Sequence, residues 1–215
     1  MKSALSIVAL AAVLWSLPGP TAAGEHDVRP VPQVDLARFA GTWYEVARLP
    51  NRFQADCASD VIARYEPRPD GTLQVLNACR TPTGRVETDV GRAWPADKDQ
   101  RNPAKLKVSF MPRWLQWLPV GKGDFWVVML DPQYRYAVVS EPTRQHLWVL
   151  ARTPAPPADD LGRIVDRLAA QGYPTHQLVL TRHTGADRDT GARPGAPMSA
   201  RPPLIVRQEG AGRAG

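Results

Sequence analysis

The feature that most constrains the fold is a short pattern of alternating apolar and polar residues that recurs along the middle of the chain. The runs follow one another at intervals of roughly ten residues, and each ends at Gly, Pro, Asp or Asn. This pattern is typical of an all-β domain. It predicts eight strands, over Thr42 to Arg48, Asp60 to Glu66, Thr72 to Cys79, Arg85 to Ala93, Lys105 to Phe110, Phe125 to Leu130, Arg135 to Ser140 and His146 to Arg152.

Alternation also predicts which face of each strand is buried, because successive side chains point to opposite sides of a sheet. In the second strand Arg64 and Glu66 would face water, which turns Val61, Ala63 and Tyr65 inward. In the fourth and fifth strands the same rule predicts outward side chains at Glu87, Asp89, Lys105, Lys107 and Ser109, and inward side chains at Val86, Thr88, Val90, Leu106, Val108 and Phe110.

A sheet of eight strands with one apolar face can bury that face as a sandwich or as a closed barrel. Short turns at residues 69–71 and 82–84 make sequence neighbours into sheet neighbours, which favours up-and-down closure. Residues 159–172 then carry apolar side chains at helical spacing, and residues 176–181 predict one last short strand. The predicted fold is therefore an all-β, eight-stranded antiparallel up-and-down barrel with one C-terminal α-helix packed outside.

The two ends of the chain differ from this domain in composition. Lys2, a short apolar run and small residues predict a secretory signal peptide, cleaved after Ala23 or Gly24, with an uncleaved anchor as the alternative. This segment has no cysteine to carry a lipid, so we expect an exported protein in the periplasm, peripheral at the outer membrane, or secreted. The predicted divisions are 1–23 signal peptide, 24–33 linker, 34–183 barrel domain and 184–215 disordered Gly/Ala/Arg/Pro-rich tail.

The formal net charge of +6 raises the question of a nucleic-acid partner. Five arginines lie within residues 184–215, and the other basic residues are scattered through the domain. No basic helix, zinc-ligand spacing or aromatic RNA-binding motif accompanies them. The composition therefore predicts solubility with weak attraction to anionic membranes, and no nucleic-acid partner.

Three blocks of residues, in a fixed order, carry a resemblance to a known family. The first is Gly41 to Pro50, with Gly41 and Trp43 in a Gly-x-Trp triplet, and the third is Leu147 to Arg152. The second block contains Leu130, Asp131, Tyr134, Arg135 and Tyr136.

Together these blocks resemble the lipocalins over residues 34–183, and within that family the bacterial outer-membrane lipocalins and apolipoprotein D. The resemblance implies that Trp43 closes the base of the barrel and that Arg152 packs across its ring. It also implies a protein that binds a small hydrophobic ligand at the cell envelope.

The chain has two cysteines, Cys57 and Cys79, just before the second strand and at the end of the third. Antiparallel pairing of those strands brings the two residues together, which makes a disulfide reasonable in an oxidising compartment. A redox or metal-binding pair is the alternative, although there is no Cys-x-x-Cys spacing and no nearby histidine.

The side chains that line the barrel would decide the ligand. Trp148 shares its strand face with Arg152, so we expect it to face the cavity and rank it first among lining residues. Either Trp126 or Phe125 should join it, and Arg48, Arg64 or Arg113 would take an anionic head group. The other expected ligand-binding residues are Tyr65, Leu106, Val108 and Phe110 by alternation, and Trp114 and Trp117 from the loop 111–123.

That loop is unusually apolar for an exposed segment. Three roles remain open for it at this stage: a lid over the mouth, a contact with a membrane surface, or simple packing on the barrel.

A barrel of eight strands has room for one small ligand, and a long acyl chain suits an apolar interior. We therefore expect a fatty acid or lysophospholipid to bind without being chemically altered. The sequence has no nucleophile elbow, His-Glu-x-x-His motif, phosphate loop or dinucleotide fingerprint, and we expect no metal and no cofactor. The alternatives are an enzyme acting on lipids, and a filled barrel that binds membranes or partners through its surface.

Overall fold

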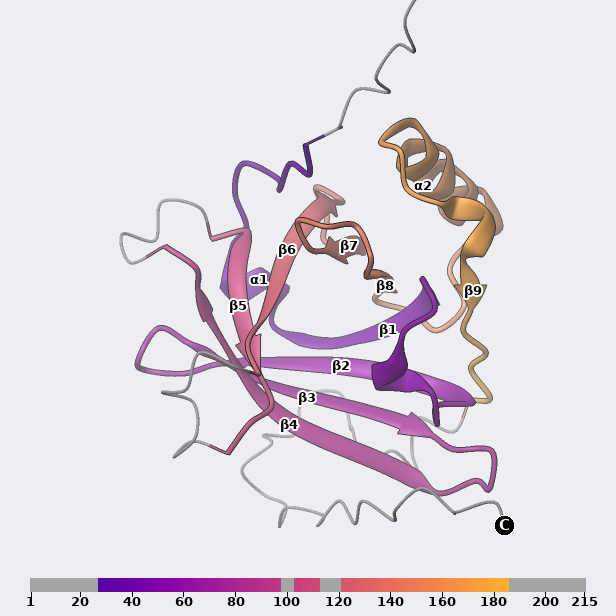
Figure 1. Cartoon of the computed structure of the whole chain (residues 1–215), viewed down its shortest axis with the longest axis horizontal. Helices are drawn as coiled ribbons and strands as arrows, with labels where there is room; N and C mark the ends of the chain where they lie inside the picture. The colour runs from indigo at the N-terminus through magenta and orange to yellow at the C-terminus, as the bar shows by residue number, and fades with distance from the viewer. Residues whose placement is uncertain (1–26, 98–102, 113–120, 186–215) are drawn as a thin grey trace, which may run out of the picture.

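The computed structural model describes residues 27–97, 103–112 and 121–185 (Figure 1). Within them the chain folds into one antiparallel sheet and four short or medium helices. The helices are α1 (Leu36–Phe39), the 3-10 turns η1 (Arg52–Gln54) and η3 (Thr175–Gln177), and α2 (Ala158–Ala170). The strands are β1 (Gly41–Arg48), β2 (Ser59–Pro67), β3 (Leu73–Arg80), β4 (Val86–Pro95), β5 (Lys105–Ser109), β6 (Gly123–Leu130), β7 (Tyr136–Ser140), β8 (Leu147–Ala151) and β9 (Val179–Leu180).

Strand β1 closes the sheet on itself. The strand order is β2-β3-β4-β5-β6-β7-β8-β1-β9, and β1 also pairs with β2. Within β1, Trp43 lies opposite Ala63 of β2, while Tyr44 lies opposite Ala151 of β8. Because the strands from β1 to β8 each pair with their sequence neighbours and β1 also pairs with β8, the predicted eight-stranded up-and-down barrel is confirmed.

The two ends of the barrel are built differently. We call the end where β1 begins the base; the short helix α1 lies there beside β2. We call the end where β1 finishes the mouth. In the described part of the chain it is surrounded by residues 49–58, 81–85, 110–112, 121–122 and 141–146.

A bulge in β1 changes which of its side chains face the interior. The register against β8 shifts between Glu45 and Ala47, so that Glu45 pairs with Leu150 and Arg48 pairs with Trp148. Residues paired across an antiparallel ladder point to the same face. Leu150 and Trp148 belong to the interior cluster, and therefore Glu45 and Arg48 both face inward.

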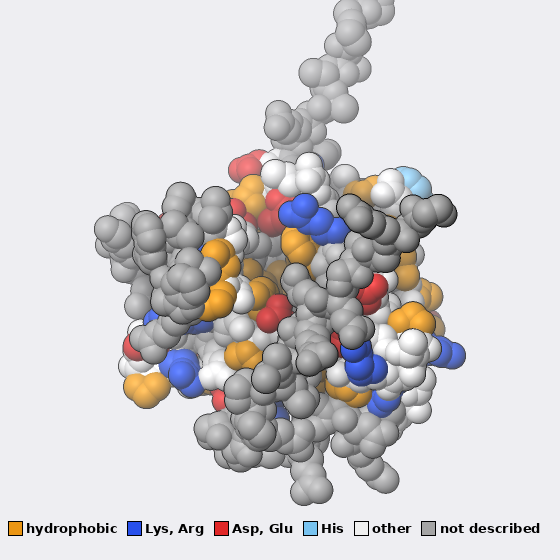
Figure 2. All heavy atoms as spheres, turned by 60° about the horizontal axis from the view of Figure 1, so that its bottom comes forward, with side chains coloured by type: hydrophobic (Ala, Val, Ile, Leu, Met, Phe, Trp, Pro, Cys, Tyr) orange, Lys and Arg blue, Asp and Glu red, His pale blue; other side chains and the backbone are white. Residues whose placement is uncertain are grey.

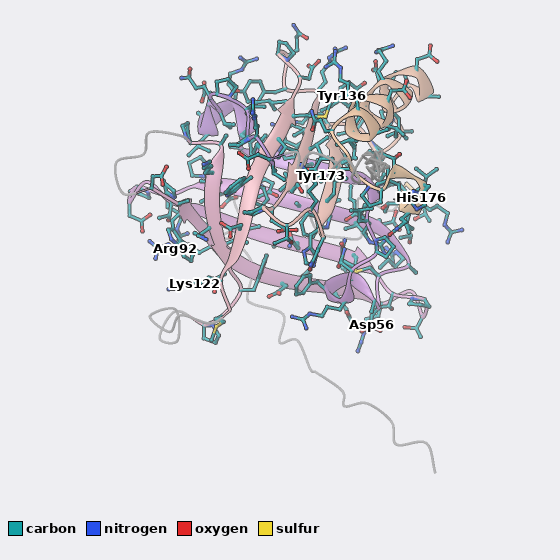
Figure 3. The ribbon with its side chains drawn as sticks, turned by 45° about the horizontal axis from the view of Figure 1, so that its top comes forward. Asp56, Arg92, Lys122, Tyr136, Tyr173 and His176 are labelled. Atoms are coloured by element: carbon teal, nitrogen blue, oxygen red, sulfur yellow. A yellow bond between two sulfur atoms is a disulfide. The ribbon has the colours of Figure 1, made fainter. Side chains whose placement is uncertain are left out.

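Apolar side chains form two main clusters, one inside the barrel and one outside it. The outer cluster lies under α2, where Ile164 and Leu168 pack against the backs of β1, β7 and β8. Tyr136 donates a hydrogen bond to the Asp160 carboxylate in the first turn of α2, on the upper side of Figure 3. The inner cluster contains Phe39, Trp43, Ala63, Tyr65, Leu73, Val75, Ala93, Leu106, Val127, Ala137, Val139 and Leu150.

The predicted faces are right for most of the tested strands and reversed in β4. In β2 and β5 the inner cluster or its fringe holds Ala63, Tyr65, Leu106, Val108 and Phe110, as expected. In β4 the register instead pairs Ala93 with inward-facing Leu73, and Glu87 with Cys79 on the same face. The prediction is therefore wrong for that strand: Glu87 and Asp89 face inward, and Val86, Thr88 and Val90 face outward.

Two outward side chains are also less exposed than the alternation rule implies. Arg64 lies on the outer face of β2 with only 7% of the residue exposed, and Ser109 of β5 is 1% exposed. Arg64 lies 3.4 Å from the Glu66 carboxylate. An outward position on this barrel therefore does not guarantee contact with water.

The C-terminal segment adds a strand at the seam between β1 and β2. The predicted strand over His176 to Thr181 is shorter than expected: residues 175–177 form η3, and β9 covers only Val179–Leu180. β9 pairs with Ala47 and Arg48, beyond the point where β1 parts from β2. The barrel is thus closed by two partners of β1, one at the base and one at the mouth.

Asp60 ties the residues after β9 to β2. Its side chain is fully buried and accepts hydrogen bonds from the Thr184 backbone N–H at 2.7 Å, the Thr184 hydroxyl at 2.8 Å and the Ser59 hydroxyl at 2.9 Å. The Arg80 Nε lies 3.4 Å from the same carboxylate. We refer to Asp60, Ser59, Arg80 and Thr184 as the C-terminal anchor.

The predicted disulfide is confirmed. Cys57 and Cys79 are joined, and their Cα atoms lie 5.6 Å apart. The bond links the connection after β1 to the end of β3, so it fastens that connection to the wall of the mouth. Both cysteines of the chain are used in this bond.

Replacing both cysteines by serine should lower the free energy of unfolding by about 3 kcal/mol, because the bond restricts the unfolded chain. Urea unfolding of the oxidised protein and of the double variant measures this difference. Dithiothreitol should bring the wild-type protein to the stability of the variant and leave the variant unchanged. Equal stability of all three would contradict the prediction.

Several predicted features fall outside the described residues. These are the signal peptide and the first three residues of the linker, nearly all of the tail, and the loop residues Arg113, Trp114 and Trp117. Among the residues that the structure does describe, no helix is long and apolar enough to span a bilayer.

Candidate functional site

The barrel interior changes from filled to accessible between the base and the mouth. At the base, Trp43, Phe39 and Leu106 are each no more than 1% exposed. Nearer the mouth, the inward-facing Val108 and Trp148 are only partly buried. Solvent therefore reaches the inner wall from the mouth and not from the base.

The base is sealed by a tryptophan and an arginine. The Arg152 guanidinium carbon lies 3.8 Å from the centre of the Trp43 ring, and the indole N–H donates to the Phe39 carbonyl at 2.8 Å. Burial lowers the pKa of Arg152 to about 10, so its guanidinium remains charged at neutral pH. This geometry combines a cation–π contact with a satisfied indole, and it gives both residues a structural position.

The second motif block lies beside this seal. The Asp131 carboxylate accepts hydrogen bonds from Arg135 at 2.8 and 3.0 Å, and these bonds hold the pKa of Asp131 below its usual range. The Tyr134 hydroxyl accepts a hydrogen bond from the Asp35 backbone N–H at 2.9 Å, next to α1. Gly41, at the start of β1, has φ +93°, which favours glycine, and a Cβ added there would lie 3.5 Å from Arg152 Nη1. These residues shape the base and none faces the mouth.

An apolar wall faces the accessible part of the interior. Phe110 of the loop after β5 lies across Gly91, where an added Cβ would come within 2.6 Å of the phenyl ring. Phe125 of β6 joins the same cluster and lies 5.7 Å from the Tyr65 ring. A long apolar ligand entering from the mouth would meet these rings together with Val108.

A polar wall lies on β1 and the connection after it. The Trp148 indole N–H donates to Gln54 Oε1 at 2.8 Å, and Gln54 Nε2 donates to Glu45 at 2.5 Å. The Thr181 hydroxyl donates to the other Glu45 oxygen at 2.5 Å, and Arg48 Nε lies 3.6 Å from it. Burial raises the pKa of Glu45, which is 2% exposed. Trp148 is therefore held in place by a hydrogen-bonded chain that leads to a buried carboxyl group.

A row of rings runs from this wall to the rim. The His146 ring stacks on Trp148 with centroids 6.0 Å apart, and the Phe53 ring lies 5.4 Å from His146. Phe53 is 65% exposed. His146 also lies 3.6 Å from the Glu141 carboxylate. His146 is the residue just before β8. The rim therefore presents the apolar ring of Phe53 beside the polar side chains of His146 and Glu141.

Acidic residues mark the opposite part of the mouth. The β4 register turns Glu87 and Asp89 inward, with Asn77 of β3 opposite Asp89. Arg85 Nη2 donates to the Glu87 carboxylate at 2.6 Å, so that charge already has a partner. Figure 2, which brings the lower side of Figure 1 forward, likewise shows hydrophobic, acidic and basic side chains intermixed between the grey segments.

The predicted lining residues separate into groups. Tyr65 and Leu106 lie in the filled part of the interior, where burial raises the pKa of the Tyr65 hydroxyl. Val108, Phe110 and Trp148 lie in the accessible part. Trp126 is a correction: it is in the outer cluster, with Lys105 Nζ 4.6 Å from the centre of its ring, and Phe125 faces inward instead. Trp114 and Trp117 lie outside the described residues.

Sequence reasoning missed three residues of the polar wall and its surroundings. Glu45 lies within the first motif block but was not predicted as a site residue. Gln54 lies in a connection whose sequence has no apolar periodicity. Asp89 was predicted to face outward, so the acidic part of the mouth was not predicted. The alternation rule offered no signal for any of them, because each depends on a bulge, a loop or a strand register. In the described part of the chain, no group of three His, Cys, Asp or Glu residues is placed to hold a metal ion.

Comparison with known proteins gives a consistent result. A family model described as "Lipocalin-like domain" matches residues 34–183. Temperature-induced lipocalin-1 of Arabidopsis thaliana is 34% identical over 171 residues, which cover 79% of this chain and 90% of that protein. Outer membrane lipoprotein Blc of Escherichia coli K12 is 31% identical over 184 residues, covering 85% and 96%.

Solved structures resemble the fold at lower identity. Insecticyanin of the tobacco hornworm Manduca sexta aligns with a TM-score of 0.59 at 21% identity, covering 74% of this chain and 86% of that chain. H1 crustacyanin of the lobster Homarus americanus aligns with a TM-score of 0.55 at 13% identity, covering 70% and 81%. These two likenesses concern the fold alone.

Proposed function

The chain belongs to the lipocalin-like family, whose members bind small hydrophobic ligands, and from this premise we propose that it binds a single-chain lipid inside the barrel. The proposed ligand is a fatty acid or a lysophospholipid, held without chemical change. The observation that carries the proposal is the accessible apolar wall near the mouth, where Phe110, Phe125 and Trp148 are inward-facing but only partly buried.

The physical basis is the burial of the acyl chain. Each methylene transferred from water to the apolar wall contributes about 0.8 kcal/mol, and the loss of free motion on binding offsets part of the sum. The filled base, with Trp43 and Leu106, sets a floor below which the chain does not pass. The polar group of the lipid then lies toward the mouth, near the hydrogen-bonded wall of Glu45 and Gln54.

The proposed setting is the cell envelope. Two observations bear on it: the relative Blc is called an outer membrane lipoprotein, and the first residues of this chain read as an export signal. Cys57 and Cys79 are paired with each other, so neither carries a lipid in this form. We propose peripheral rather than covalent attachment to the membrane. The role that follows is storage or transport of lipid, in keeping with a family that generally binds and carries rather than catalyses.

The test is a titration of the delipidated mature protein with palmitate and with palmitoyl lysophosphatidylcholine, followed by tryptophan fluorescence. Saturable one-to-one binding is expected. Trp148→Ala should weaken it about tenfold, because the variant loses roughly the apolar contact area of one aromatic ring.

Trp126→Ala is the matched control, since it removes the same side chain from the outer face. It should change the dissociation constant by less than about twofold. No saturable binding by the wild-type protein, or equal weakening by the two variants, would contradict a ligand site within the barrel.

A further inference from the structure

Two arginines on the described strands and their ends face the barrel interior, and they differ in how their guanidinium groups are used. Arg152, at the base, donates to the Thr42 carbonyl at 2.9 Å, the Arg38 carbonyl at 2.7 Å and the Tyr134 carbonyl at 3.3 Å. With Trp43 below it as well, this guanidinium has little capacity left for a ligand. Any inward anion site must therefore be sought elsewhere.

Arg48, near the mouth, has the opposite environment. It pairs with Trp148 across the ladder, and its side chain is only 14% exposed. Its Nε is buried without a hydrogen bond, and among the described residues its one ion-pair contact is with Glu45, at 3.6 Å. A guanidinium group carries five N–H donors, so most of the donors of Arg48 remain available to a bound group.

Glu45 positions Arg48 without accepting a hydrogen bond from its guanidinium N–H groups. Both Glu45 oxygens already accept short hydrogen bonds, one from Gln54 and one from Thr181, each at 2.5 Å. Burial also raises the pKa of Glu45, which favours its neutral form and leaves the charge on Arg48 less compensated. The carboxyl group thus fixes the arginine stem while the guanidinium stays open to the interior.

We propose that Arg48 binds the anionic group, a carboxylate or a phosphate, of the lipid held in the barrel. This inference rests on the proposed function. Of the two suggested arginines that the structure describes, it selects Arg48, because Arg64 lies on the outer face of β2; Arg113 lies outside the described residues. A planar guanidinium suits either anion, and a partly desolvated one binds it more strongly than a solvated one does.

The charges around the mouth support one orientation of the head group. Asp89 faces the interior from β4, which lies two strands beyond β2 in the sheet order, and its carboxylate disfavours an anion on that wall, whereas the neighbouring Glu87 is paired with Arg85. On the β1 wall, Arg48 neighbours Trp148 and the accessible apolar surface. The anion therefore lies against β1, and the acyl chain extends from there toward Val108 and the base.

The test compares three probes with the same sixteen-carbon chain length at pH 8: palmitate, palmitoyl lysophosphatidylcholine and uncharged hexadecanol. Arg48→Met keeps the length of the stem and removes the charge. It should weaken the binding of palmitate, of the lysophospholipid or of both by about 10- to 100-fold, the range expected for one charge-assisted contact. Hexadecanol should be affected by less than about twofold.

Two further variants act as controls. Lys122→Met removes an exposed cation from the same side of the molecule, labelled in Figure 3, and should leave all three affinities within about twofold. Arg48→Lys keeps the charge and should recover part of the lost affinity. Near-ultraviolet circular dichroism checks that each variant keeps the wild-type packing.

The outcomes are distinct. Selective loss for one charged probe supports the proposal and identifies a carboxylate or a phosphate as the preferred anion. Equal loss for all three probes would mean that Arg48 only packs, and no loss would mean that it touches no ligand; either result overturns the proposal while leaving the lipid site intact. If wild-type protein binds none of the probes, hexadecanol included, the proposed function fails and this inference fails with it.

Discussion

Replacing Trp43 by alanine is expected to lower the free energy of unfolding by about 3–5 kcal/mol, a large part of the roughly 5–15 kcal/mol of stability that a folded domain usually has. The side chain is fully buried, stacks beside Phe39 with ring centroids 5.0 Å apart and lies under Arg152. Its removal leaves a cavity at the base and a guanidinium group without its ring, and it takes away the indole N–H that donates to the Phe39 carbonyl. Urea unfolding at neutral pH, followed by far-ultraviolet circular dichroism, measures the loss.

Phe53→Ala provides the comparison, because that ring is 65% exposed at the rim. Its substitution should change stability by less than about 0.5 kcal/mol. A double-mutant cycle between Trp43 and Arg152 should further give a coupling of about 1–2 kcal/mol from the cation–π contact. A Trp43→Ala protein as stable as the wild type would show that the base is not the packed seal described above.

Replacing Asp60 by alanine is expected to have an effect of similar size, about 3–5 kcal/mol, because it breaks a buried charged network from one side. The substitution leaves Arg80 without the carboxylate and removes the acceptor for the two donors of Thr184. The C-terminal anchor would then hold the seam more weakly. Asp124→Ala is the control, since Asp124 pairs with Lys107 at 2.7 Å on the surface; it should cost less than about 1 kcal/mol.

The Asp60 effect should also depend on pH in a defined direction. Burial alone would raise the pKa of Asp60, but the hydrogen bonds from Thr184 and Ser59 outweigh it and the net pKa is lowered. A lowered carboxyl pKa stabilises the folded state above the unfolded pKa, about 4, and this contribution is lost as the pH falls through the folded value. Wild-type protein and Asp60→Asn should therefore differ most at neutral pH and converge in acid. A constant difference from pH 7 to pH 3 would contradict the assignment.

Alternation predicted the barrel well where one face of a strand is simply buried. In β5 and β8 the inward positions of Leu106, Val108 and Trp148 follow directly from period-two patterning. The rule works there because each strand is regular, and because its inward side chains are apolar along its whole length.

The same rule failed in β4 because the mouth is wet. It assumes that charged residues mark the outside, whereas Glu87 and Asp89 face inward where solvent enters the barrel. The apolar Val90 is correspondingly 47% exposed on the outer face. A strand that passes from the solvent-excluded base to the solvent-accessible mouth has inward side chains of both kinds, apolar and polar. Alternation in the sequence therefore does not identify its inward face.

Bulges and long-range contacts account for the other differences. The register shift in β1 places Arg48 on the same face as Glu45. Strict alternation along the strand would place the two residues on opposite faces. The parity of Trp126 was open because every residue from Phe125 to Leu130 is apolar, and only pairing with β5 decides it. Likewise, Gln54 meets Trp148 only after the barrel has closed.

The closure of the barrel by β1 also bears on how the chain folds as it emerges. β1 forms from residues 41–48, yet one of its edges has no partner until residues 147–151 have been made, and the mouth end of the other edge has none until residues 179–180 have been made. Contacts of such long sequence separation form slowly, and an open strand edge invites pairing with other chains. The Cys57–Cys79 bond joins segments from the first half of the chain, so it can form well before the seam does. We therefore expect the disulfide to form before β9 pairs with β1. The unpaired edge of β1 is then the site where we expect misassembly to begin.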